Sequence, residues 1–169
     1  VTMAGVLDKV KARKGIDLTN EFLQAAQDGK LGKVKSLLKA DPSLLEARGG
    51  GYGRTLLMYA AMCEEDNSRL ISELLSHGAR ADEADDDGWS ALHYACKYGA
   101  PAHVALIADA PGADLNARDY MQRTPVMCAA CRLVDDDDAA AAQMIAALAQ
   151  RGAHLDLQDV LGQTAAHIA

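Results

Sequence analysis

The sequence predicts an all-α solenoid, a row of stacked helical units with no single closed core. One observation is a nine-residue segment at residues 87–95 that returns in altered form at residues 52–60, 121–129 and 161–169. The Thr or Ser in fourth place is separated from the next by 35, 34 and 40 residues, a period typical of stacked helical repeats. The other observation is that apolar residues follow the 3.6-residue period of helices over long stretches, which argues against a β-rich fold.

Composition agrees with helices that pack closely. Half of the 169 residues are hydrophobic but only 4% are aromatic, so alanine and leucine supply most of the core. The formal net charge is −7, and the chain has no large Lys/Arg cluster. This argues against a protein that binds the phosphate backbone of a nucleic acid. No apolar run reaches the roughly 18 residues of a membrane span. The four cysteines lie in predicted helices, which favours reduced thiols and a cytoplasmic or nuclear location.

The chain divides into an N-terminal arm or helix at residues 1–19 and a repeat domain at residues 20–169. In the first unit, a short helix ends near Gly29, and Val34, Leu37 and Leu38 form the inward face of the next helix. The expected units span residues 20–50, 51–85, 86–118, 119–158 and a partial 159–169.

Proline and glycine residues mark helix boundaries in the first three units. Pro42 ends the second helix of the first unit, Gly78 follows the last periodic residue of the second unit, and Pro101 suits a first helical turn. Leu70 and Leu74 share one helix face. The sequence therefore predicts helices near residues 55–63, 68–77, 90–98, 101–110, 124–132, 138–151 and 163–169.

A Thr or Ser opens the first helix of each of these units. Thr55, Ser90 and Thr124 are placed so that the hydroxyl accepts a hydrogen bond from a free N–H of the first turn. Such a cap contributes about 0.5–2 kcal/mol. Pro125 is pre-organised for the same turn.

These motifs resemble the ankyrin repeat family from about residue 20 to residue 169. The family's Thr-Pro-Leu-His-x-Ala-Ala core appears as Thr55–Ala61, Ser90–Cys96 and Thr124–Ala130, and its Leu-Leu-x-x-Gly-Ala ending appears as Leu74–Ala79. The resemblance implies L-shaped repeats, each with two antiparallel helices and a β-hairpin-like turn. It also implies binding of protein partners, without a common catalytic activity or cofactor.

Two units depart from the family's pattern between their helices. The usual Gly is present as Gly29 and Gly99, but Glu64 and Leu133 stand at this place in the second and fourth units. The fourth unit also carries about seven extra residues near 134–140. We expect both inter-helix loops to depart from the family's geometry.

The resemblance implies that the turn tips and the concave face of the first helices bind the partner. The only Trp and three of the five Tyr fall on this surface, and Trp, Tyr and Arg dominate interface energetics. The alternative is that these aromatic residues merely shield repeat edges. The expected partner-binding residues are Tyr52, Arg54, Met62, Asp86, Asp87, Trp89, Lys97, Tyr98, Tyr120, Met121, Arg123 and Arg132.

Other groups of residues resemble functional motifs, but each has a simpler structural explanation. Residues 49–55 are glycine-rich but lack the spacing and the Lys of a phosphate loop. Cys128 and Cys131 have the spacing of redox or zinc sites, without a second ligand pair or a βαβ context, so we expect a core thiol beside a partly exposed one. Asp135–Asp138 lacks the alternating ligands and Gly turn of a calcium loop. We therefore predict no metal site and no cofactor.

Charged residues and histidines leave further expectations. Asp85–Asp87, with Asp82 and Glu83, form an acidic lip that either steers a basic partner or is a solvated turn. The resemblance implies that His93 ties neighbouring turns together, whereas His103 has no partner recognisable in the sequence.

Two functional interpretations remain open at this stage. The chain is a protein–protein interaction module or adaptor, or it is the regulatory or targeting region of a larger enzyme or channel. The partial unit at residues 159–169 leaves apolar surface uncovered, which predicts fraying or weak end-to-end self-association.

Overall fold

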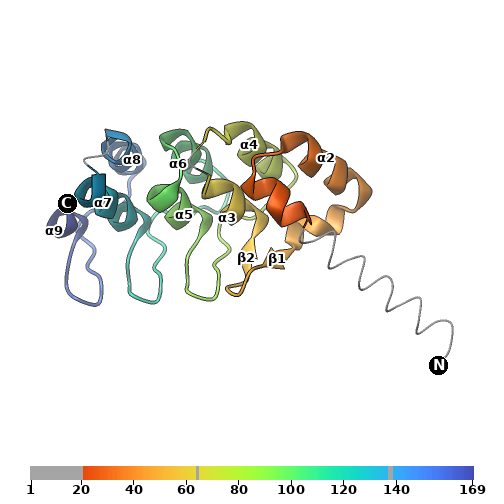
Figure 1. Ribbon diagram of the computed structural model, residues 1–169. Coiled ribbons are helices and arrows are strands. Elements are labelled where there is room, and N and C mark those ends of the chain that lie inside the picture. The colour runs from red at the N-terminus through yellow and green to blue at the C-terminus, as the bar shows by residue number, and fades with distance from the viewer. Residues whose placement is uncertain (1–20, 64, 137–138) are drawn as a thin grey trace, which may run out of the picture.

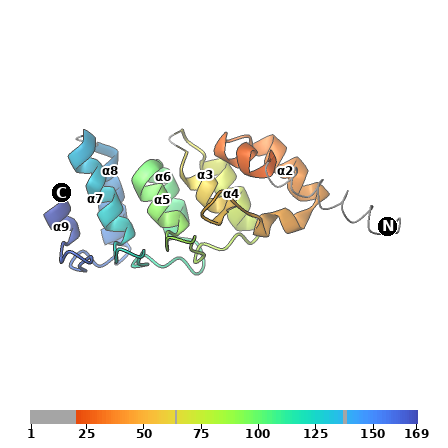
Figure 2. The same ribbon diagram turned by 60° about the horizontal axis from the view of Figure 1, so that its bottom comes forward.

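The structure, a computed structural model, describes residues 21–63, 65–136 and 139–169. Paired helices stand in a row, and the turns between pairs all project to one side, at the bottom of Figure 1. The row persists in the second view (Figure 2). The predicted all-α stack of repeats is therefore confirmed. The expected arm at residues 1–19 lies outside the described residues.

The elements follow the predicted order. Residues 21–27 are helical. Strand β1 (Arg48–Gly49) pairs antiparallel with β2 (Arg54–Thr55), so that the first turn is a true hairpin. The helices are α2 (Leu31–Ala40), η1 (Pro42–Glu46, a 3-10 helix), α3 (Leu56–Ala61), α4 (Ser68–Ser76), α5 (Ala91–Tyr98), α6 (Pro101–Ala108), α7 (Pro125–Asp136), α8 (Ala139–Gln150) and α9 (Ala165–Ile168). None of the helices within the described ranges is long and apolar enough to cross a bilayer.

The helices pack in two rows. In the inner row α5 contacts α3 and α7, and in the outer row α6 contacts α4 and α8. Fully buried alanines in the inner row let the backbones approach closely, while larger side chains fill the space between the rows. Each unit therefore depends on its neighbours for burial. The largest fully buried side chains include Leu56, Leu57, Met58, Leu70, Ile71, Leu74, Leu92, Ile107, Met127, Met144 and Leu148.

The helix starts differ in part from the predicted caps. The Thr55 hydroxyl accepts a hydrogen bond from the Met58 N–H at 3.4 Å, as predicted. The Ser90 hydroxyl instead lies 2.9 Å from Nδ1 of His93, because that ring reaches back over the first turn. The Thr124 hydroxyl is buried and has no hydrogen-bond partner. The cap is thus built by a hydroxyl in one unit and by a histidine in the next.

The fourth unit corrects one boundary. Its first helix, α7, was predicted to end near residue 132 and continues to Asp136. Leu133 stands where the first and third units have glycine, and it supplies no break in the helix. At least part of the insertion therefore lengthens a helix rather than a loop. Residues 137–138 of the acidic run, and Glu64 of the second unit, lie outside the described residues.

Candidate functional site

An open groove of about 220 Å³ lies where the turn tips of the second, third and fourth units meet the inner helix α5. Five aromatic rings, two arginines and one aspartate surround it. All of them except Tyr94 belong to the surface predicted from the sequence. The lining residues are Tyr52, Arg54, Asp87, Trp89, Tyr94, Tyr98, Tyr120 and Arg123.

Hydrogen bonds between successive turns hold the edges of the groove. The backbone N–H of Asp86 donates to the Tyr52 carbonyl at 3.0 Å, and the Tyr120 N–H donates to the Asp87 carbonyl at 3.1 Å. The next pair of turns is joined in the same way, from the Val160 N–H. The tips therefore form a connected row rather than independent loops.

An aspartate closes each of the last three turns, and the first two of the three, Asp85 and Asp119, are buried. Asp85, Asp119 and Asp159 occupy the same repeat position, and one carboxylate oxygen of each accepts hydrogen bonds from the N–H groups two and four residues later. For Asp119 the distances to the N–H groups of Met121 and Arg123 are 2.9 Å and 2.8 Å. These bonds fix the turn geometry that presents the groove residues.

Aromatic rings form the floor of the groove. The ring centroids of Trp89 and Tyr94 are 5.1 Å apart, and Trp89 is stacked on Tyr98 at 6.4 Å. Tyr94 is buried and Trp89 is half-buried, whereas Tyr52, Tyr98 and Tyr120 are 49%, 44% and 66% exposed. Trp89 therefore contributes to the internal packing as well as to the surface.

Arg54 is held by a relay that ends on a buried carboxylate. Its Nε donates to the Tyr94 hydroxyl at 2.7 Å, and that hydroxyl donates to Asp85 at 2.6 Å. Its guanidinium also lies over the Tyr52 ring, 4.9 Å from the centroid. Burial, together with the hydrogen bond to Asp85, raises the pKa of Tyr94, so this hydroxyl stays protonated as the link in the relay.

Arg123 is neutralised more directly. Its Nε and Nη2 lie 2.8 Å and 2.7 Å from one oxygen of Asp119, whose side chain is fully buried. The guanidinium also lies over the Trp89 ring, 5.5 Å from the centroid. Asp119 thus closes its turn and anchors a groove residue at the same time.

Five residues of the predicted surface lie outside the groove lining. Arg132, on α7, donates from Nη1 to the Gly99 carbonyl at 2.7 Å, which links two neighbouring units. Asp86 is exposed at the tip beside the groove. The other three, each half-buried, are Met62 after α3, Lys97 on α5 and Met121 at the fourth turn.

The acidic lip is smaller than its sequence indicates. Asp85 is buried beneath the turn, and Asp82 and Glu83 form ion pairs with Arg80 at 2.8 Å. The hydrogen bond from Arg80 lowers the pKa of Asp82. Two carboxylates, Asp86 and Asp87, remain on the rim without an ion pair among the described residues.

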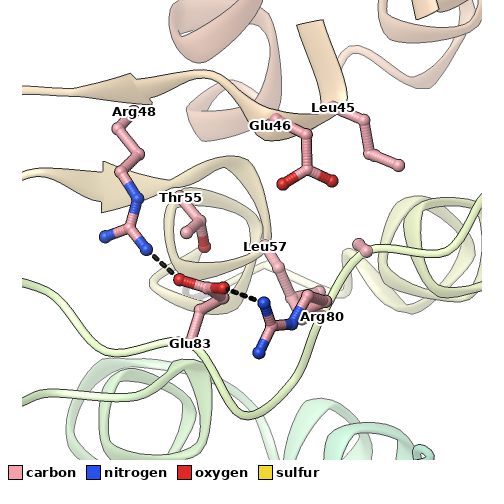
Figure 3. A pocket seen from close by; sticks show the side chains of 8 residues that line it. Leu45, Glu46, Arg48, Thr55, Leu57, Arg80 and Glu83 are labelled. Atoms are coloured by element: carbon pink, nitrogen blue, oxygen red, sulfur yellow. Dashed lines mark hydrogen bonds and ion pairs between the residues drawn. The ribbon is translucent and has the colours of Figure 1, made fainter. Parts of the chain in front are cut away.

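A second pocket, of about 110 Å³, lies between η1 and the loop that precedes the third turn. Figure 3 shows Glu83 between Arg48 and Arg80, with an ion pair to each. Arg48 also donates to the carbonyls of Gly53 and Ala84, at 3.1 Å and 3.0 Å. These charged groups have their ion-pair and hydrogen-bond partners within the chain. The pocket is therefore a polar contact between two units.

The cysteines follow the expected orientation. Cys128 is buried and Cys131 is half-buried, and none of the four cysteines forms a disulfide. Burial raises the pKa of the Cys128 thiol to about 12, so it carries little thiolate at neutral pH. In the described part of the chain, no three His, Cys, Asp or Glu side chains are grouped so that they could hold a metal ion.

Two buried histidines join neighbouring units. This role was predicted for His93 but not for His103. His93 Nε2 donates to the Arg123 carbonyl at 3.1 Å, as the resemblance implies. His103 Nε2 accepts a hydrogen bond from the Asn67 N–H at 2.8 Å, and Asn67 is itself buried. No short-range pattern marks this pair, because the two residues come from different units.

These histidines predict a loss of stability in mild acid. Burial lowers the pKa of His93 and of His103 below 6.5. The unfolded chain therefore binds more protons than the folded chain as the pH falls below 6.5, and the free energy of unfolding decreases. We expect a decrease of up to about 1 kcal/mol per histidine between pH 7.5 and 5.5, measured by urea unfolding.

Substitution separates this effect from other titrations. The His103→Gln variant is less stable at pH 7.5, but its stability should change less between the two pH values. The exposed His154→Gln variant should keep the wild-type pH dependence. Equal pH dependence in wild type and His103→Gln would contradict the assignment.

The chain is similar in sequence to known repeat proteins. Residues 22–119 match the family model described as ankyrin repeats (3 copies). The chain is 36% identical over 115 residues to ankyrin repeat domain-containing protein 63 of Mus musculus and of Homo sapiens, which covers 66% of this chain and 29% and 30% of those proteins. It is 35% identical over 82 residues to NF-kappa-B inhibitor delta of Mus musculus, which covers 48% of this chain and 24% of that protein. The chain therefore spans less than a third of each relative's length.

Proposed function

Because the chain belongs to the ankyrin repeat family, whose repeats generally serve protein–protein interaction, we propose that it binds a protein partner through the groove and the adjoining turn tips. The groove is the single observation that carries this proposal. It combines three exposed tyrosines, a half-buried tryptophan and two arginines on a connected row of turns.

The physical support is pre-organisation. The hydrogen bonds between turns and the buried aspartates fix the tips before a partner arrives, so less conformational entropy is lost on binding. Exposed aromatic rings around a hollow provide the apolar contact that dominates interface energetics. One relative is named as an inhibitor of NF-kappa-B, which agrees with a role exerted through another protein.

We propose that the chain has no catalytic activity of its own. Both arginines of the groove are held by buried carboxylates, Arg123 directly by Asp119 and Arg54 through the Tyr94 hydroxyl by Asp85. The thiols of Cys96 and Cys128 lie close in sequence to groove residues, but both are buried, and burial raises the pKa of each so that it stays protonated at neutral pH. The wider surface extends the proposed footprint along the inner helices through Met62, Lys97 and Arg132, and at the fourth turn through Met121.

The Tyr52→Ala/Tyr120→Ala double variant tests the proposal. Partners captured from a lysate by the immobilised chain are identified and purified, and their affinity is then measured for wild type and variant. We expect the affinity to fall about 30-fold or more, because interface tyrosines commonly contribute 1–2 kcal/mol each. Both rings are largely exposed, so the thermal midpoint should shift by no more than about 2 °C.

Leu155→Ala is the matched control, since it truncates an exposed apolar side chain outside the groove. Its affinity for the same partner should equal that of wild type. If every purified partner binds the double variant as tightly as wild type, the groove is not the binding surface.

A further inference from the structure

We infer that the groove selects a partner segment that presents a lysine or arginine to Asp86 and Asp87, an inference that rests on the proposed function. We call these two residues the acidic rim. Some charges of the site are already balanced within the chain, and others remain for a partner.

The arginines of the groove do not make it a site for anions. Nη2 and Nε of Arg123 lie 2.7 Å and 2.8 Å from the same oxygen of the buried Asp119. Arg54 lies 4.0 Å from the buried Asp85 and is joined to it through the Tyr94 hydroxyl. Each guanidinium charge is therefore offset by a carboxylate fixed beneath it, and an incoming anion would meet the field of the pair rather than of a free cation.

The acidic rim has no such balance. Within the described part of the chain neither Asp86 nor Asp87 forms an ion pair, and neither carboxylate accepts a hydrogen bond. Asp87 lines the groove and Asp86 is exposed at the same tip. Together with the two buried aspartates, the rim sets four carboxylates against two arginines, a formal charge of −2.

The rim is also rigid and next to exposed aromatic rings. The Asp87 N–H donates to the buried Asp85 at 3.0 Å, and backbone bonds tie the rim to the tips on both sides. Tyr52 and Tyr120 are 49% and 66% exposed on these neighbouring tips. A lysine or arginine can lay its apolar stem on such rings while its charge meets the carboxylates. The chain's net charge of −7 favours the approach of a basic segment.

The experiment uses a phage library of random 12-residue peptides, panned on the immobilised full chain. Peptides that bind wild type but not Tyr52→Ala/Tyr120→Ala are sequenced, and the affinity of the commonest is measured. We expect at least a twofold excess of Lys and Arg over the starting library. In Asp86→Asn/Asp87→Asn the affinity should fall about tenfold, chiefly through slower association, and the dependence on salt should flatten.

Glu65→Gln/Asp156→Asn is the matched control, because it removes the same formal charge at two exposed residues outside the groove. Its affinity should stay within about twofold of wild type. Enriched peptides that are neutral or acidic, no enrichment at all, or unchanged binding by the rim variant would each overturn the inference. Neutral or acidic peptides that still need Tyr52 and Tyr120 would leave the proposed function standing. Peptides that bind without those tyrosines would instead contradict the proposed function.

Discussion

Asp119→Ala is expected to lower the free energy of unfolding by about 3 kcal/mol, which is large for one substitution. Asp119 is 1% exposed and accepts hydrogen bonds from two backbone N–H groups and from Arg123. Alanine leaves those buried donors without an acceptor and Arg123 without its counter-charge. Urea unfolding of the purified variant measures the loss.

Two companion variants divide this effect into its parts. Asp119→Asn keeps an oxygen for the backbone donors but removes the charge beside Arg123, so its loss should be smaller. Asp114→Ala removes an exposed aspartate that accepts only from the Asn116 N–H, and its loss should stay near 0.5 kcal/mol or less. Equal stability of Asp119→Ala and Asp114→Ala would show that the buried carboxylate does not hold the turn.

Gly99→Ala is expected to destabilise the fold by about 1–3 kcal/mol through overpacking. Gly99 has an ordinary φ of −87°, so its backbone does not require glycine. The requirement is space, because a Cβ there would lie 2.4 Å from the Ala61 carbonyl oxygen and 2.9 Å from that of Ala95. Both contacts are backbone atoms of packed helices, so either α5 or α3 must shift.

Gly32→Ala is the opposite case and serves as the control. A Cβ at this position in α2 meets no atom within 4 Å. Alanine also has the higher helix propensity, so the free energy of unfolding should rise by about 0.5–1 kcal/mol. Thermal unfolding of the two variants side by side gives the comparison, and a gain in stability for Gly99→Ala would refute the close approach of the two units.

The repeat period in the sequence predicts most of the helices correctly. Signals carried by single residues, such as Pro42 after α2 and Gly78 after α4, mark boundaries that the structure reproduces. The prediction was wrong at the end of α7. At this place the fourth unit has no glycine or proline that would end the helix. Leu133 is compatible with a helix, so the sequence alone does not say whether the insertion is helix or loop.

The groove was only partly predictable. Register placed Tyr52, Trp89 and Tyr120 on a common surface, but it did not show that Trp89 packs against Tyr94 and is half-buried. The roles of the turn aspartates were missed, although Asp85, Asp119 and Asp159 recur at the repeat spacing. An aspartate in a turn is usually solvated, and only the three-dimensional turn shows which one faces inward.

Contacts between residues of different units have no detectable signal in the sequence. The hydrogen bond from Asn67 to His103 depends on how one helix pair sits against the next. Neither residue belongs to the recurring motif, and a lone histidine gives no indication of its partner. The same holds for the ion pair of Glu83 with Arg48.

Trp89 offers the most direct test of the central claim that a partner occupies the groove. It is the only tryptophan in the chain and it lines the groove, so its fluorescence reports on this site alone. The measurement is acrylamide quenching of Trp89 with and without a saturating, tryptophan-free binding peptide. Occupation of the groove predicts a blue-shifted emission and a smaller quenching constant in the complex. Saturable binding that leaves both the emission and the quenching of Trp89 unchanged would place the partner elsewhere on the molecule.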